Sequence, residues 1–244
     1  EEQLWDLEGR RDREAWDLLH AALHWCQDAG LRAVVDLHIL RAHHFNAGPR
    51  GQPLFTDARA VDRFVQCWTE LSEALRGYPN DFLAYELLNE PVADADGDWN
   101  RVLRAPYQAL RSLEPRRVIA IGSNRWNSVE AYPSFEPPRD DPLILLVFHF
   151  YFPMPLTHYR ARWTGRLAEY DGPIEYPGRP IPETALATLD ADLRAYLAQW
   201  NEPCDAAMIE QRIQPALEKA AQLNLPLWCN EFGAYKAAPP KVRL

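Results

Sequence analysis

Hydrophobic positions along the chain follow two alternating spacings. Apolar side chains recur every three to four residues over 15–29 and 61–75, and again over about 99–113, 184–200 and 205–223, which predicts amphipathic helices. Short apolar runs, several of them β-branched, predict buried strands at about 32–38, 82–90, 117–122, 143–151 and 225–231. Strands that alternate with helices predict parallel βαβ units.

The connections between these elements are long and stiff. The chain has 21 prolines against 11 glycines, and its longest loops are predicted at 39–56 and 152–183. No linker, low-complexity tract or internal repeat divides the sequence. We therefore expect residues 1–244 to form a single domain.

Polar side chains follow the predicted strands at their carboxyl ends. His38, the pair Asn89-Glu90, the pair Ser123-Asn124, His149 with Tyr151, and Glu231 all have this placement. An open doubly wound sheet and a closed barrel both fit the alternation, but no GxGxxG or GxxxxGK[ST] motif follows the first strand. Functional groups gathered from the ends of many strands are typical of a TIM (β/α)8 barrel, which is the fold we predict.

Composition excludes several classes of partner. With 26 basic and 35 acidic residues the net charge is −9, which argues against binding to nucleic acid. The longest apolar run, Leu143 to Phe148, has the length of a strand, so no membrane span is expected. The four cysteines form no CxxC pair, and we expect buried thiols, no metal and no cofactor.

Two glutamates at separate strand ends have the chemistry of glycoside hydrolysis. Glu90 lies in Tyr-Glu-Leu-Leu-Asn-Glu and is followed by Pro91, while Glu231 lies in Trp-Cys-Asn-Glu-Phe-Gly. In such a pair one carboxylic acid protonates the leaving oxygen, and the other carboxylate attacks or activates water. A glutamate at a strand end is more often structural when taken singly, but each of these belongs to its own motif.

Two further pairs are expected to share a strand face. His149 and Tyr151 are two residues apart, as are Asp36 and His38. A buried His–Tyr pair that satisfies its own hydrogen bonds is one interpretation of the first. The other is a tyrosine hydroxyl that donates to a carboxylate, beside a histidine that orients the sugar or the acid.

These residues carry a resemblance to glycoside hydrolase family 5, a cellulase-type (β/α)8 family. The motifs are Asp36-Leu-His38, Leu88-Asn-Glu-Pro91, His149-Phe-Tyr151 and Asn230-Glu-Phe-Gly233, in the family's order. The resemblance implies that Glu90 is the general acid/base and Glu231 the nucleophile. It also implies that Asn89 binds the sugar 2-hydroxyl, that Tyr151 positions the nucleophile, and that His38 and His149 line the glycone subsite. Trp126, in a long loop, is expected to stack on a sugar face.

The resemblance covers residues 10 to 235 without filling the family's barrel. The Asp-x-His strand is the third in the family and the Glu-Phe-Gly strand the seventh, so about five of eight strands are expected here. The family's arginine on the second strand and its sugar-stacking tryptophan on the eighth have no counterpart. The chain begins at Glu1 without a signal peptide. We expect part of the catalytic domain of a longer enzyme, monomeric when complete and, from its substrate class, extracellular or periplasmic.

The family spans several polysaccharides, and an endo-β-1,4-glucanase that acts with retention is the default expectation, with a β-glucan, mannan or oligosaccharide as partner. Two rivals remain open. One is a metal-dependent amidohydrolase-type enzyme that uses His38, His43 and His44. The other is a barrel that binds carbohydrate without cleaving it, through its loop tryptophans and tyrosines. Acyl transfer lacks a GxSxG motif.

Overall fold

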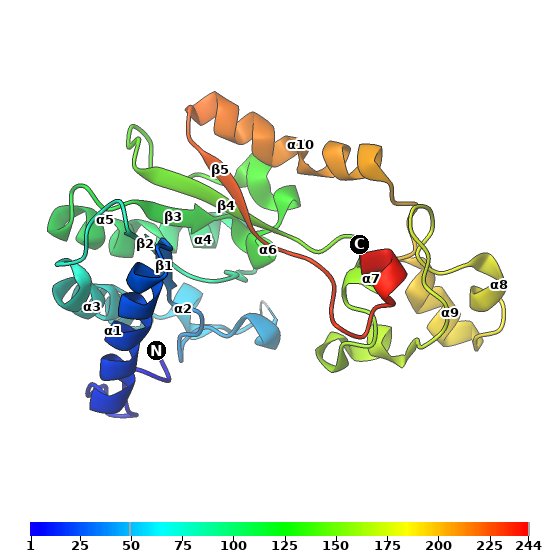
Figure 1. The fold of residues 1–244 in the computed structure, drawn as a ribbon, viewed down its shortest axis with the longest axis horizontal. Coiled ribbons are helices and arrows are strands. Elements are labelled where there is room, and N and C mark those ends of the chain that lie inside the picture. The colour runs from blue at the N-terminus through cyan, green and yellow to red at the C-terminus, as the bar shows by residue number, and fades with distance from the viewer. Residues whose placement is uncertain (49, 244) are drawn as a thin grey trace. The chain divides into compact units, whose positions relative to one another are not determined.

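The computed structural model describes residues 1–48 and 50–243 (Figure 1). Pro49, in the predicted loop 39–56, and Leu244 lie outside the described residues. The described chain divides into two compact units. Unit 1 comprises Glu1–Phe148 and Glu218–Trp228, and unit 2 comprises His149–Leu217 and Cys229–Leu244.

Five strands form one parallel sheet in sequence order, β1-β2-β3-β4-β5. They are β1 (Ala33–Asp36), β2 (Leu83–Glu86), β3 (Ile119–Gly122), β4 (Ile144–Phe150) and β5 (Leu227–Phe232). The register pairs Ala33 with Leu83, Tyr85 with Ile119, and Ile119 with Ile144. Next to β5, the Leu146 N–H donates to the Pro226 carbonyl at 2.9 Å. The order and direction predicted from the sequence are confirmed, and this is the strand arrangement of part of a (β/α)8 barrel.

The helices of unit 1 begin and end where local chemistry allows. They are α1 (Arg13–Asp28), α2 (Pro53–Thr56), α3 (Ala58–Leu75), α4 (Asp96–Val102), α5 (Arg104–Leu113) and α6 (Asn124–Asn127), with 3-10 turns η1 (Phe45–Ala47) and η2 (Val129–Ser134). The carboxylates of Asp12 and Asp57 cap α1 and α3. The single helix predicted over 99–113 is wrong, because two helices meet at Leu103. Pro106 follows closely and has no N–H to donate to the turn before it.

The core of unit 1 lies between helix α3 and the sheet. Phe64, Trp68 and Leu71 of α3 are fully buried, as is Tyr85 of β2. The Trp68 indole packs on the Tyr85 ring and donates to the Leu87 carbonyl at 2.9 Å. Burying side chains of this size stabilises the fold by roughly 1.5–3 kcal/mol each. The packing therefore fixes the carboxyl end of β2, from which Asn89 and Glu90 follow.

Unit 2 consists mainly of short helices. They are α7 (Met154–Thr157), the 3-10 segment η3 (Arg162–Glu169), α8 (Glu183–Leu186), α9 (Ala191–Ala198) and α11 (Pro240–Arg243), and α10 (Ala206–Leu223) continues from unit 2 into unit 1. Apolar side chains of α7, η3, α8, α9 and α11 share one core, which includes Leu156, Ile174, Ile181 and Leu197. The helix predicted over 184–200 is two helices, because Asp190 caps the start of α9 through the N–H groups of the next turn.

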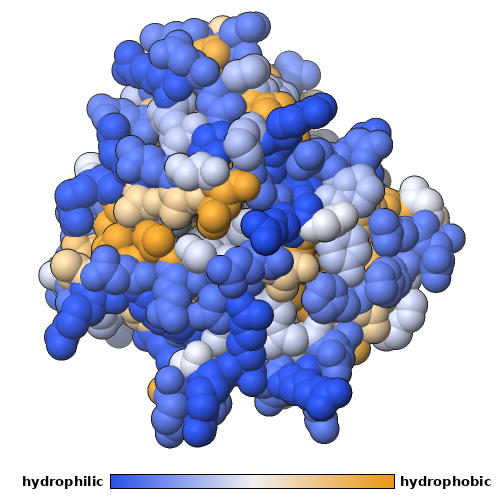
Figure 2. All heavy atoms as spheres, turned by 90° about the vertical axis from the view of Figure 1, so that its left-hand side faces the viewer, coloured by the Kyte–Doolittle hydropathy of each residue, from blue (hydrophilic) through white to orange (hydrophobic). Residues whose placement is uncertain are grey.

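Strands β1 and β5 are the outer strands of the sheet. The large apolar side chains of Leu18 and Trp25 in α1, of Leu31, and of Val34 in β1 are exposed. Apolar atoms also interrupt the mostly hydrophilic surface on the face drawn in Figure 2. Open strand edges template further pairing, and exposed apolar patches promote association. Within residues 1–48 and 50–243, no helix is both long and apolar enough for a membrane span.

Candidate active site

Glu90 lies beyond strand β2, four residues after the strand ends at Glu86. The prediction that the strand ends at Glu90 is therefore wrong, because the strand ends at Glu86. The backbone nevertheless stays bonded to its neighbours, since the Leu87 N–H donates to the Ala120 carbonyl at 3.1 Å and the Asn89 N–H to the Leu37 carbonyl at 3.2 Å. Asn89 is buried and Glu90 is half-buried. Backbone hydrogen bonds like those of a sheet therefore continue past the end of β2 as far as Asn89, the residue before Glu90.

The backbone at Glu90 is in the left-handed region, with φ of 46°. A residue with a side chain is held in such a conformation at a cost of order 1–3 kcal/mol, and only where its surroundings impose it. Three hydrogen bonds hold the residues that follow: Trp126 N–H to the Pro91 carbonyl (3.2 Å), Val92 N–H to His43 Nε2 (3.1 Å) and Ala93 N–H to Asn124 Oδ1 (2.8 Å).

Asp36 and His38 share a face of β1 and its extension, as predicted. His38 Nδ1 lies 2.8 Å from Asp36 Oδ2, and the exposed imidazole meets the edge of the Phe45 ring. The carboxylate fixes the tautomer and orientation of the ring, which leaves Nε2 directed away from Asp36. His38 is thus an oriented polar group at the carboxyl end of β1.

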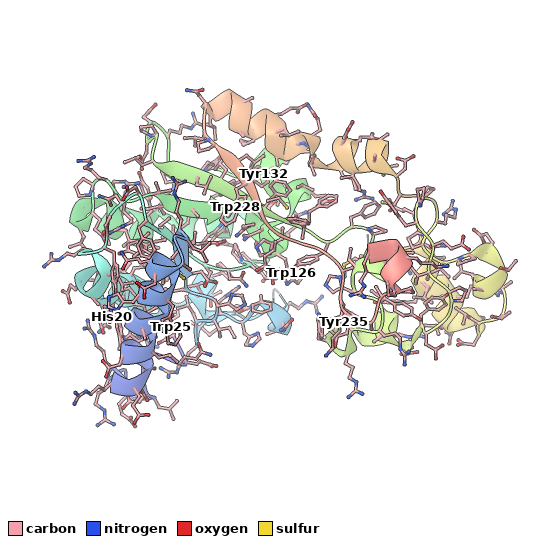
Figure 3. The ribbon with its side chains drawn as sticks, in the orientation of Figure 1. His20, Trp25, Trp126, Tyr132, Trp228 and Tyr235 are labelled. Atoms are coloured by element: carbon pink, nitrogen blue, oxygen red, sulfur yellow. The ribbon has the colours of Figure 1, made fainter. Side chains whose placement is uncertain are left out.

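Trp126 belongs to a left-handed turn that directly follows β3 (Figure 3). Arg125, Trp126 and Asn127 have φ values of 57°, 61° and 54°, a conformation that costs roughly 1–2 kcal/mol per residue. The indole is 43% exposed and its N–H donates to the Phe45 carbonyl at 3.0 Å. The turn therefore presents Trp126 on the surface and ties it to the loop that also contacts His38.

Glu86 is a buried carboxylate that the sequence analysis did not single out. It ends β2 with 5% of its surface exposed, and Asn127 Nδ2 donates to its Oε1 at 3.4 Å. Asn127 also fills the space above Gly122, where any Cβ would collide with it. The sequence offered one signal for this buried group, because Glu86 is a charged residue within the otherwise apolar run of 83–88.

In unit 2, two side chains converge on one oxygen of Glu231. The Tyr151 hydroxyl donates to Glu231 Oε2 at 2.9 Å, and His149 Nδ1 lies 3.4 Å from the same atom. His149 is buried, while Tyr151 and Glu231 are half-buried. The prediction that the tyrosine hydroxyl donates to a carboxylate is confirmed, and both polar groups of the His–Tyr pair face that carboxylate. Contacts with two side chains fix the direction of this carboxyl group.

Further contacts hold this cluster in place. The Thr157 hydroxyl donates to the Tyr151 carbonyl at 2.8 Å, and the His158 ring meets the Tyr151 ring edge-on at 5.1 Å between centroids. Tyr235, labelled in Figure 3, packs edge-on against the exposed Trp163. Cys229 lies two residues before Glu231, and burial raises the pKa of its thiol to about 11, so the thiol stays neutral and unreactive.

The histidines of the predicted loop 39–56 already have partners. His43 is buried, and its Nε2 accepts from the Val92 N–H. His44 Nδ1 accepts from the Asn46 N–H at 3.2 Å, and His38 is bonded to Asp36. Among the residues that the structure describes, His38, His43 and His44 do not form a group whose ligand atoms converge on one point, so this rival loses its main support.

Comparison with known proteins places the chain among cellulases. Residues 3–242 match the family described as Cellulase (glycosyl hydrolase family 5). The chain is 27% identical over 241 residues to Endoglucanase C of Acetivibrio thermocellus, covering 98% of this chain and 69% of that one. It is 24% identical over 221 residues to Cellodextrinase A of Ruminococcus flavefaciens, covering 90% and 58%. The chain thus spans roughly two thirds of the length of these relatives.

Solved structures share the fold. The Clostridioides difficile cellulose synthase subunit Z superposes with a TM-score of 0.74 at 16% identity, over 99% of this chain and 68% of that one. Thermotoga maritima Cel5A in complex with cellobiose superposes with a TM-score of 0.72 at 19% identity, over 98% and 65%. With a family match across nearly the whole sequence, the chain belongs to the cellulase family of O-glycosyl hydrolases, glycosyl hydrolase family 5.

Proposed function

We propose that this chain carries the catalytic apparatus of a retaining β-glucan hydrolase of the endo-β-1,4-glucanase kind, with units 1 and 2 as one catalytic domain. The observation that carries the proposal is the carboxylate of Glu231, on which the Tyr151 hydroxyl and the His149 imidazole converge. A carboxyl group aimed in this way by two side chains suits a nucleophile. Family membership and the names of the relatives support the substrate class.

In the first step of the proposed reaction, a Glu231 oxygen attacks the anomeric carbon. The glycosidic C–O bond breaks as Glu90 gives its proton to the leaving oxygen. In the second step Glu90 takes a proton from water, the water oxygen attacks the same carbon, and the ester bond to Glu231 breaks. Two inversions give net retention. This assignment predicts carboxyl groups about 5–5.5 Å apart, whereas an inverting enzyme needs roughly 6.5–9.5 Å.

Four other residues have proposed roles in binding. Asn89, which precedes Glu90, would bind the sugar 2-hydroxyl. His38 and His149 would line the glycone subsite, and the exposed indole of Trp126 would stack on a sugar ring. Relatives named endoglucanase and cellodextrinase favour β-1,4-glucan or its oligosaccharides as substrate. One solved relative is described in complex with mannotriose, so mannan belongs in the test panel.

Product stereochemistry tests the proposal. Purified protein is mixed with cellotetraose or mannotetraose in D2O, and the first anomer released is followed by 1H NMR before mutarotation. Retention predicts the β-anomer of the new reducing end first. Initial formation of the α-anomer would show inversion and remove Glu231 from the nucleophile role. Binding of these sugars without any cleavage would instead favour the non-catalytic carbohydrate-binding barrel.

A further inference from the structure

The backbone that carries Glu90 is strained without a glycine to relieve it. Glu90 has a φ of 46° and is followed by Pro91, whose ring restricts the conformation of the residue before it. A left-handed residue with a side chain persists only where neighbouring groups impose that conformation. The atoms that impose it therefore help to set the direction in which the Glu90 side chain leaves the backbone.

The restraints act just after the bend, on three successive residues. Trp126 N–H donates to the Pro91 carbonyl, the Ala93 N–H donates to Asn124 Oδ1, and Asn124 Nδ2 returns a bond to the Ala93 carbonyl at 3.1 Å. Asn124 and Trp126 both belong to the turn after β3. The remaining restraint, on Val92, comes from a different part of the chain.

That restraint is the imidazole of His43, 49 residues away in sequence. His43 is 1% exposed, its Nε2 accepts from the Val92 N–H at 3.1 Å, and its ring stands edge-on to Phe55 at 5.7 Å between centroids. A reciprocal pair of backbone hydrogen bonds to Leu40 holds the histidine itself. Because Nε2 accepts, the ring proton is on Nδ1.

We propose that His43 is a positioning residue for Glu90: its Nε2 holds the Val92 N–H and so keeps the left-handed bend, and with it the carboxyl of the acid/base, in place for proton transfer. This inference rests on the proposed role of Glu90. His43 does not touch the reacting atoms and acts only through the backbone of residues 90–92. Displacing a catalytic group by about 1 Å can lower the rate about 100-fold, so loss of the bond between His43 and Val92 is expected to slow catalysis.

The bond from the Val92 N–H needs an acceptor, and Nε2 of a neutral His43 provides it. Burial, with a smaller contribution from His44, lowers the pKa of His43 to about 4, so the imidazole is neutral near neutral pH. An apolar side chain in its place would leave the buried Val92 N–H without this partner. A glutamine has a carbonyl oxygen close to where Nε2 lies and would restore it.

The test compares His43→Leu, His43→Gln and the matched neighbour His44→Leu on two substrates with one glycone. Dinitrophenyl β-cellobioside has a leaving group that needs no proton, whereas cellotetraose needs the proton of Glu90. For His43→Leu we expect kcat/KM on cellotetraose to fall about 30- to 100-fold, and kcat/KM on the dinitrophenyl substrate to stay within threefold. His43→Gln should recover most of the loss, and His44→Leu should change neither value.

Hydrogen exchange of the Val92 amide, measured by NMR in the wild type and both His43 variants, tests the hydrogen bond to His43 independently of activity. Faster exchange in His43→Leu, with protection restored in His43→Gln, is expected. Equal losses on both substrates, or unchanged exchange of Val92, would overturn the positioning role. A wild-type protein that cleaves neither substrate would remove the proposed function, while the exchange of Val92 would still decide whether His43 holds this segment.

Discussion

The two glutamates proposed for catalysis are held in different ways. In unit 2 the side chain of Glu231 is held directly, because the Tyr151 hydroxyl and His149 Nδ1 both reach its Oε2. In unit 1 the position of Glu90 is set through its backbone, by a left-handed bend whose following residues are bonded to His43 and Asn124.

This difference matches what each group must do in the proposed reaction. A nucleophile has to be ionised and aimed whenever substrate arrives, and hydrogen bonds donated to its oxygen favour that state. An acid/base must give up and regain a proton in each cycle. A backbone bend sets where such a residue starts from the main chain.

The largest expected effect comes from removing the directly held carboxylate. Glu231→Ala should lower turnover of cellotetraose by about 10⁴-fold or more, because no other group replaces the nucleophile. Added azide should restore reaction on dinitrophenyl β-cellobioside and give the α-glycosyl azide. Glu90→Ala is the matched control, in which azide should instead give the β-glycosyl azide. The same anomer from both variants would contradict the assignment of roles.

Unit 1 should respond to pH through His43. The pKa of His43 falls from 6.5 to about 4 on folding, so the folded state binds fewer protons than the unfolded chain between these values. The stability that the neutral imidazole contributes is complete above pH 6.5 and is lost as the pH falls towards 4, by about 3 kcal/mol in total. Urea unfolding at pH 7, 5.5 and 4 should show this extra loss in the wild type and its absence in His43→Gln. Parallel stability curves for the two proteins would contradict the buried, neutral state.

Unit 2 should respond to loss of a single donor. Tyr151→Phe removes the hydroxyl that bonds Glu231 while keeping the ring, and a hydrogen bond to a charged group contributes about 1.5–3 kcal/mol. We expect kcat to fall about 30-fold with little change in thermal stability. Tyr159→Phe is the matched control, since that hydroxyl donates to the Asp171 and Gly172 carbonyls in the same unit. Equal effects on kcat from both variants would show that the donor to Glu231 has no special role.

The smallest expected effect concerns Trp126. Trp126→Phe retains an aromatic face but removes the indole N–H that donates to the Phe45 carbonyl, at a cost of about 1 kcal/mol. We expect KM for cellotetraose to rise about fivefold with kcat within twofold, by steady-state kinetics. The exposed Trp25 of α1 provides the control, since Trp25→Phe should change neither constant. An unchanged KM in Trp126→Phe would remove Trp126 from the proposed sugar site.

The sequence predicted the order and direction of the strands because apolar runs and helical spacing are local signals. It also predicted that His38 and Asp36 share a face, since residues two apart on a strand point to the same side. The contact of Tyr151 with Glu231 followed from the resemblance to the family, not from spacing along the chain. The strand end before Glu90 was placed wrongly, because an apolar run does not reveal where a sheet ladder stops. The bond between His43 and Val92 depends on tertiary packing across 49 residues, which no local pattern encodes. The left-handed turn at 125–127 could not be predicted from the sequence, because it contains no glycine.

The central claim is that Glu231 forms the covalent bond to the sugar. Purified protein is incubated with 2,4-dinitrophenyl 2-deoxy-2-fluoro-β-cellobioside, which slows release of a covalent intermediate, and is then digested and mapped by mass spectrometry. The predicted result is one fluorosugar per chain, on the peptide that contains Glu231, with no label in Glu231→Gln. A label on Glu90, or hydrolysis of this reagent without any covalent adduct, would contradict the assignment.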